Sequence, residues 1–176
     1  MPAPSLAAIT GFDQKLVVGV ADLAVSSNPS VVLTTYSLGS CLGITIFDPV
    51  TRVGGLLHAM LPDSTIDPVK AAAQPAMFID TGIPALFRAA YQLKADKFRV
   101  QICVAGGAQV MDGSGFFSIG KRNYETLIKL LSQHGLVVRA EHVGGMVSRT
   151  VHLDLRTGEV KLKVSGQDTE TILWKG

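Results

Sequence analysis

Short runs of β-branched and apolar residues, separated by turn-forming residues, dominate the pattern of this chain. A strand is predicted wherever such a run is β-branched or alternates apolar with polar positions. The predicted strands are residues 31–36, 42–47, 54–60, 98–104, 137–142, 149–155 and 160–164. The last two alternate cleanly on either side of Arg156, Thr157, Gly158 and Glu159, which predicts a hairpin.

Two other segments repeat apolar residues at the spacing of a helix. The first starts near residue 75, and its apolar positions are Leu86, Ala89, Ala90 and Leu93. Pro84 is expected to start or kink the second part of this helical region. The second segment has Tyr124, Leu127, Ile128 and Leu131, followed by Gly135 where a helix C-cap belongs.

Strands therefore outnumber helices, and hairpins are common. We predict an α+β domain in which a mostly antiparallel sheet, or a sandwich of hairpins, is flanked by about two to three helices. The length of 176 residues fits one domain over residues 1–176, with a loose N-terminal arm at 1–15 and a C-terminal tail at 166–176. Charged residues make up only 17%, which excludes a disordered chain and suggests that some apolar surface meets a partner.

Charge and cysteine usage exclude several classes of protein. The net charge is +2 and no three basic residues are consecutive, so a nucleic-acid partner is not expected. The longest apolar runs are too short to enter a bilayer, and the first fourteen residues carry no Lys or Arg of a secretory signal. Cys41 and Cys103 have neither disulfide-framework nor metal-ligand spacing. A cytoplasmic protein without a metal or cofactor is expected.

Cys41 and His58 form the candidate site. A cysteine acts as a nucleophile through its thiolate, and an adjacent imidazole can take the thiol proton. If residues 42–47 and 54–60 form a hairpin with Cys41 opposite His58, the turn centre falls beside the turn signal Asp48-Pro49. Opposed residues have Cβ atoms about 4.5–5.5 Å apart. The register is open by a residue, because hairpins disfavour a two-residue type I loop.

Neighbouring residues fit supporting roles. Backbone N–H groups at Gly39 and Ser40 are candidates for stabilising an oxyanion, and Thr35 for bonding the second ring nitrogen of His58. The alternative is structural, since free cysteine is often buried and a lone histidine is usually a core residue. Cys103 is expected to be inert on its strand. A structural role is preferred for His142, interaction with the helix dipole for His134, and a place on a solvated strand face for His152.

The chain also resembles a known family. The residues that carry the resemblance are the string LGSCLGITIFDP at 38–49, GGLLHAMLP at 54–62, Gly106-Gly107-Ala108, IGKRN at 119–123 and Val143-Gly144-Gly145. These motifs occur in the same order as in the chemoreceptor glutamine deamidase family, CheD, and the resemblance covers roughly residues 30–165. The resemblance implies that Cys41 is the nucleophile, His58 the general base and Thr35 the residue that orients it. Cys103, Ala105 and His142 depart from the family pattern, which concerns substrate or partner contacts more than chemistry.

The function implied by the resemblance is that of a cysteine-dependent amidohydrolase, a protein-glutamine glutaminase. It would convert glutamines in the cytoplasmic helical region of methyl-accepting chemoreceptors to glutamate through a thioester. The alternative is a regulatory binding module that docks to a CheC-type phosphatase, the partner expected in this family; a redox role is weak without C-x-x-C. Substrate would lie in an apolar groove, whose candidate residues are Leu38, Gly39, Gly106, Gly107, Phe116 and Phe117.

Overall fold

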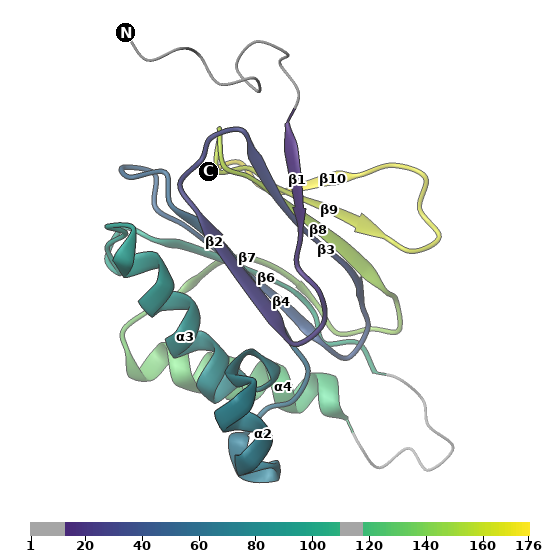
Figure 1. Ribbon diagram of the computed structural model, residues 1–176. Helices are drawn as coiled ribbons and strands as arrows, with labels where there is room; N and C mark the ends of the chain where they lie inside the picture. The colour runs from purple at the N-terminus through teal and green to yellow at the C-terminus, as the bar shows by residue number, and fades with distance from the viewer. Residues whose placement is uncertain (1–12, 110–117) are drawn as a thin grey trace, which may run out of the picture.

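Two five-stranded sheets pack face to face, and helices cover the outer face of one of them (Figure 1). The computed structural model describes residues 13–109 and 118–176. The first sheet has the strand order β1-β3-β8-β9-β10. Its strands are β1 (Gln14–Val17), β3 (Val31–Leu38), β8 (Arg149–Asp154), β9 (Val160–Val164) and β10 (Thr171–Trp174). Of its pairings, only β1 with β3 is parallel.

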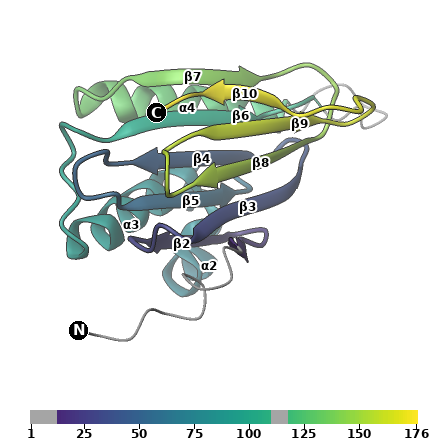
Figure 2. The same cartoon turned by 90° about the horizontal axis from the view of Figure 1, so that it is seen from above.

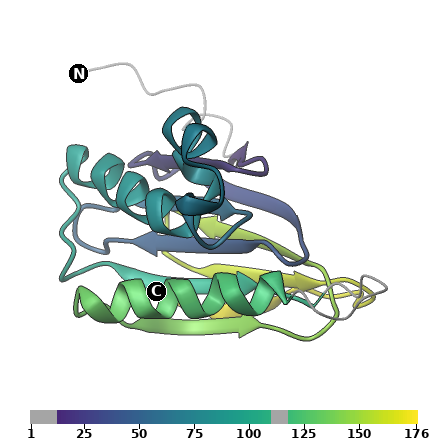
Figure 3. The ribbon, with the colours of Figure 1, turned by 90° about the horizontal axis from the view of Figure 1, so that it is seen from below.

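The second sheet has the order β2-β5-β4-β6-β7 and lies between the first sheet and the helices (Figure 2). Its strands are β2 (Asp22–Ser26), β5 (Gly54–Ala59), β4 (Leu42–Phe47), β6 (Gln101–Gly106) and β7 (Val138–Val143). Its helices are α2 (Pro68–Ala73), α3 (Ile79–Gln92) and α4 (Ile119–Gln133), with short 3-10 turns at Ser64–Ile66 and Pro75–Met77. Figure 3 shows α3 and α4 across the outer face of this sheet. Within the described residues, no helix combines the length and apolarity needed to cross a membrane.

The core has two layers, and this explains the sequence pattern. One apolar layer lies between the sheets and the other between the second sheet and the helices. Every residue of β4 and β5 is buried, because both faces of these strands are covered, so they appear in the sequence as continuous apolar runs. Strands β8 and β9 alternate because one face of the first sheet meets solvent. The predicted α+β class is confirmed.

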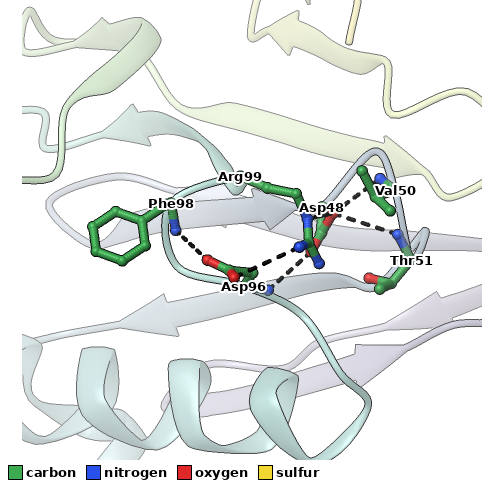
Figure 4. A network of polar contacts seen from close by, with 6 residues as sticks. All are labelled: Asp48, Val50, Thr51, Asp96, Phe98 and Arg99. Atoms are coloured by element: carbon green, nitrogen blue, oxygen red, sulfur yellow. Dashed lines mark hydrogen bonds and ion pairs between the residues drawn. The ribbon is translucent and has the colours of Figure 1, made fainter.

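The connection from β4 to β5 is held by a buried carboxylate (Figure 4). Asp48 accepts hydrogen bonds from Arg99, from the Asp96 backbone N–H at 2.9 Å and from the Val50 N–H at 2.9 Å. Asp96 in turn caps the turn by accepting from the Phe98 N–H at 2.8 Å. These bonds keep residues 96–100 out of the sheet, so the strand predicted at 98–104 begins only at Gln101, and Phe98 is 87% exposed.

Several other elements differ from the prediction. The segment 166–176 is not simply a tail, since it contains β10, which pairs antiparallel with β9. The predicted arm 1–15 overlaps β1, which begins at Gln14 and pairs with β3; residues 1–12 lie outside the described part. Pro84 lies inside α3 and starts no new helix, so its missing N–H costs α3 one backbone bond. Gly135 follows α4 with φ +68, the left-handed cap that the sequence predicts.

Candidate functional site

Cys41 lies in the short connection by which the chain leaves the first sheet and enters the second. Strand β3 ends at Leu38 and β4 begins at Leu42. The turn uses a left-handed backbone at Ser37, with φ +58, and a bond from the Gly39 N–H to the Ser37 carbonyl at 3.0 Å. Cys41 is half-buried and packs against the core layer between the sheets. The thiol therefore stands at the end of the sandwich, next to its interior.

The hairpin that carries His58 has a different register from the predicted one. His58 pairs with Gly43, and the ladder ends at Leu42 opposite Ala59. The connection held by Asp48 runs to Val53, and this longer loop moves the turn centre along the chain. The register differs by two residues, an even number, and Cys41, just before β4, still packs against the layer between the sheets. No hydrogen bond joins Cys41 Sγ to His58 Nε2 among the described residues. His58 points into the layer between the sheets and is fully buried.

Thr35 reaches His58 from the opposite sheet. Its hydroxyl oxygen lies 2.7 Å from His58 Nδ1, and the hydroxyl donates its hydrogen to the Val18 carbonyl at 2.8 Å. A threonine hydroxyl has one hydrogen, so it can only accept from the imidazole. Nδ1 therefore carries the ring proton and Nε2 carries the lone pair. The sequence expectation for Thr35 matches this contact.

Burial sets the protonation of both reactive groups. Desolvation lowers the pKa of His58 to about 4, so the imidazole is neutral at neutral pH. Its Nε2 is buried and has no hydrogen-bond partner among the described residues. Burial raises the pKa of the Cys41 thiol, opposite to the lowering expected of a cysteine that shares its proton with histidine. The two groups are thus a neutral thiol and a neutral base with a free lone pair.

Backbone hydrogen bonds to two carbonyl groups fix the segment around Cys41. The Ala108 N–H donates to the Gly39 carbonyl at 2.8 Å, and the Gly107 N–H to the Cys41 carbonyl at 2.9 Å. The N–H groups of Ser40 and Cys41 donate to no backbone carbonyl in the part of the chain that the structure describes. Gly39 is different, since its N–H is bonded to Ser37. Ser40 and Cys41 are therefore the backbone donors available to an incoming oxygen.

The double glycine beside Cys41 allows two backbones to approach closely. Gly106 has φ +114, and a Cβ there would collide with the Cys41 carbonyl oxygen. Gly107 has φ +64 and donates to that same carbonyl. Both glycines are buried, which makes them a support for the Cys41 segment; a contact of either with substrate stays a prediction. Phe116 and Phe117, the other groove candidates, lie outside the described residues, and Leu38 is a fully buried core residue.

The second cysteine lies away from this arrangement. Cys103 is 2% exposed, in β6, with its side chain in the layer between the sheets. Burial raises the pKa of its thiol to about 11. These properties agree with the prediction of an inert strand cysteine. The solvated face expected for His152 is not observed: its side chain is only 15% exposed, because Thr34, 2.8 Å away, and Glu170 lie against it.

Two buried residues near the site received no role from the sequence. Asn123 of α4 is fully buried and donates to the Ser40 carbonyl at 3.0 Å. Arg149 of β8 is 3% exposed and donates to the Gly106 carbonyl at 3.1 Å and to His142 Nδ1 at 2.9 Å. The sequence signal for Asn123 was its position, since this polar residue lies one helical turn before the core position Leu127. The Arg149 contact joins the two sheets, so no local pattern could indicate it.

Comparison with known proteins gives a consistent result. A model of the family described as "CheD chemotactic sensory transduction" matches residues 60–164. The chain is 46% identical over 159 residues to a "Probable chemoreceptor glutamine deamidase CheD" of Solibacter usitatus, covering 90% of this chain and 94% of that protein. It is 39% identical over 163 residues to a protein of the same name from Pyrococcus abyssi, covering 90% and 98%. A Neisseria meningitidis structure of the DUF152 family is a distant likeness, with TM-score 0.42 and 9% identity over 80% of this chain and 66% of that chain.

Proposed function

Since this chain belongs to the CheD family, we propose that it deamidates glutamine side chains of chemoreceptors, with Cys41 as nucleophile and His58 as general base. The names of the relatives support the deamidase activity and its receptor substrate. The observation that carries the assignment of residues is the buried, unpartnered Nε2 of His58, in the layer between the sheets against which Cys41 packs. An orphaned buried acceptor is costly in a purely structural histidine.

The chemistry follows from the neutral pair. Nε2 of His58 takes the thiol proton as Cys41 Sγ attacks the carboxamide carbon, which forms a C–S bond and a tetrahedral oxyanion. The N–H groups of Ser40 and Cys41, which bond no backbone carbonyl among the described residues, are the donors for that oxygen. When the C–N bond breaks, His58 returns the proton to the departing ammonia and a thioester remains. Water, deprotonated by His58, then attacks the thioester, and glutamate and the Cys41 thiol are released.

Thr35 is assigned the orienting role. Its accepting hydroxyl keeps the proton on Nδ1, so that Nε2 is the nitrogen left to accept from the thiol. The anion of the thiol is disfavoured at rest, because burial raises the pKa of Cys41. The proton therefore moves during attack, in contrast to enzymes that store a thiolate–imidazolium pair.

The remaining parts of the proposal concern context. The substrate is the helical cytoplasmic region of methyl-accepting chemoreceptors, which places the protein in the cytoplasm, and a CheC-type phosphatase is the expected partner. The chemistry requires no metal or organic cofactor. The competing function, a module that only docks to such a phosphatase, does not explain the buried Thr35–His58 pair.

The direct test is incubation of the protein with a receptor cytoplasmic fragment, followed by peptide mass spectrometry for glutamine converted to glutamate. Cys41→Ala should abolish conversion with the fold retained, while Cys103→Ala keeps it and serves as the matched control. Conversion by a well-folded Cys41→Ala protein would refute the nucleophile. No conversion by the wild-type protein, together with binding of a CheC-type phosphatase, would favour the docking module.

A further inference from the structure

One fully buried amide connects the chain segments that carry Cys41 and His58. Asn123, in the first half of α4, donates through Nδ2 to the Ser40 carbonyl at 3.0 Å and to the Met60 carbonyl at 2.9 Å. Ser40 directly precedes Cys41, and Met60 follows His58 by two residues. A single NH₂ group therefore bonds the backbone beside the proposed nucleophile and the backbone beside the proposed base.

The bridge stands where the sheet itself stops connecting these segments. The β4–β5 ladder ends with Leu42 opposite Ala59. Beyond this pair, Cys41 and Ser40 leave the sheet toward β3, while Met60 turns away and its N–H bonds the Met77 carbonyl at 2.9 Å. The Asn123 amide replaces the ladder bonds that would otherwise fix the distance between the two strands at this end.

The orientation of the amide is determined by its partners. Both partners are carbonyl oxygens, which only accept, so the nitrogen must face them and the side chain cannot be turned over. This orientation has an energetic cost, since the amide oxygen of Asn123, Oδ1, is buried and has no hydrogen-bond partner among the described residues. An amide that merely filled space in α4 would be better replaced by an apolar residue.

The helix that carries Asn123 is itself fixed against the Cys41 support. A Cβ on Gly120 would lie 2.5 Å from the backbone carbon of Gly107, so the first turn of α4 rests directly on the double-glycine segment. Gly107 in turn donates to the Cys41 carbonyl. The Nδ2 group of Asn123 is therefore placed by contacts that also place Cys41.

We propose that Asn123 is a positioning residue that sets the separation and alignment of Cys41 and His58. The proposal rests on the proposed function, in which these two residues exchange a proton. Proton transfer and attack need near-contact geometry, and a misplacement of about 1 Å can cost roughly 10²-fold in rate. Loss of the bridge should therefore lower kcat strongly, while KM for the receptor fragment changes little because Asn123 is buried beneath the site.

The test uses Asn123→Leu, which has the same branched shape and lacks both polar atoms. Leu127→Val, one helical turn further along the same buried face, is the control for a general loss of packing in α4. Two kinds of experiment are made on each protein. One measures kcat and KM with a receptor fragment, and the other measures the rate of Cys41 alkylation by iodoacetamide with and without His58→Ala. If Asn123→Leu does not fold, Asn123→Ala takes its place, since water can enter there.

We expect Asn123→Leu to lower kcat by about 10²-fold and to remove most of the alkylation rate that depends on His58. Leu127→Val should change kcat and the alkylation rate by less than about threefold, while its melting temperature is similar to that of Asn123→Leu. Added to His58→Ala, Asn123→Leu should cost almost nothing further, because the two changes disable one unit.

Three results would overturn the positioning role: a kcat loss no larger than that of Leu127→Val, losses that add fully with those of His58→Ala, or Cys41 alkylation that does not depend on His58. Alkylation requires no receptor. Absence of deamidation by the wild-type protein would therefore count against the proposed function alone, while the alkylation rates still decide the role of Asn123.

Discussion

His58 is neutral and protonated on one defined nitrogen, and both properties come from its immediate surroundings. The sandwich interior lowers its pKa to about 4, and the single hydrogen of the Thr35 hydroxyl, committed to Val18, assigns the imidazole proton to Nδ1. The sequence suggested the Thr35–His58 contact. It did not indicate Val18, whose carbonyl decides the direction of the bond, because Val18 directly follows β1, a strand that the pattern did not reveal.

The lowered pKa predicts how stability depends on pH. A histidine whose pKa falls from about 6.5 unfolded to about 4 folded binds fewer protons when folded, so its contribution is present above pH 6.5 and is lost as pH falls toward 4. Urea unfolding between pH 7 and 4 should show a decline that is shallower in His58→Gln. His134→Gln, at an exposed position, should keep the wild-type slope. Equal slopes for His58→Gln and wild type would contradict this prediction.

The Thr35 hydroxyl predicts a contrast between two variants. Thr35→Ser keeps an oxygen that accepts from Nδ1–H, whereas Thr35→Val leaves that N–H unpaired in the interior and releases the ring. We expect kcat for deamidation to stay within about threefold of wild type in the serine variant and to fall about 10²-fold or more in the valine variant. Nitrogen NMR of the His58 imidazole should show the Nδ1–H tautomer in Thr35→Ser but not in Thr35→Val. Similar activity in both variants would remove the orienting role.

At the scale of elements, the turn between β4 and β5 is what places His58. Asp48 is completely buried at its side chain and pairs with Arg99 at 2.8 Å. Burial alone would raise the pKa of this carboxyl, but the Arg99 guanidinium and the N–H groups of Asp96 and Val50 lower it to about 2. The turn thereby joins the hairpin to the connection between α3 and β6 (Figure 4).

Replacing the carboxylate should weaken the whole domain. Asp48→Asn removes the charge that Arg99 faces and turns an amide N–H toward donors, so the free energy of unfolding should fall by about 2 kcal/mol or more. Asp154→Asn is the control. Among the described residues the Asp154 carboxylate accepts only the Arg156 N–H, at 2.8 Å, so this change should cost less than about 1 kcal/mol. Equilibrium urea unfolding at pH 7 measures both. A smaller loss for Asp48→Asn than for the control would contradict the role of the turn.

The elements that the sequence revealed are those with a covered face. Strands β4, β5, β8 and β9 were predicted because burial imposes apolar runs or alternation on them. Strand β1 is exposed at every residue and β10 at two of four, so neither shows a period, and both lie at sheet edges. The register of the hairpin was wrong by two residues, because it depends on Asp48 bonding a segment far along the chain.

For the whole molecule, the decisive feature is that the site is shared between layers. Thr35 comes from one sheet and His58 from the other, Cys41 lies where the chain crosses between them, and Asn123 comes from the helical layer. Local sequence patterns locate Cys41 and His58 individually. Their supporting residues become apparent only when the sheets are packed, which is why Asn123 and Arg149 received no role before.

The two cysteines offer a test of this packing. Cys103 is enclosed between the sheets and the pKa of its thiol is about 11, so its alkylation requires opening of the sandwich. Cys41 is half-buried at the end and should react faster than Cys103 in the native protein. Iodoacetamide labelling followed by peptide mass spectrometry should show Cys103 reacting only as urea approaches the unfolding midpoint. Native labelling of Cys103 as fast as that of Cys41 would contradict the arrangement.

If His58 is the base of Cys41, as proposed, the division of the site between layers also determines when the thiol acquires that base. During synthesis on a ribosome, Thr35, Cys41 and His58 emerge early, close together along the chain. Strand β8, which pairs along β3, and α4, which bears Asn123, emerge only after more than half of the protein has been made. A nascent chain that already displays all three residues thus lacks the second layer and the amide that align them. Under the proposed mechanism, Cys41 therefore becomes reactive only when the chain is complete, and we expect a truncated product to carry an ordinary thiol.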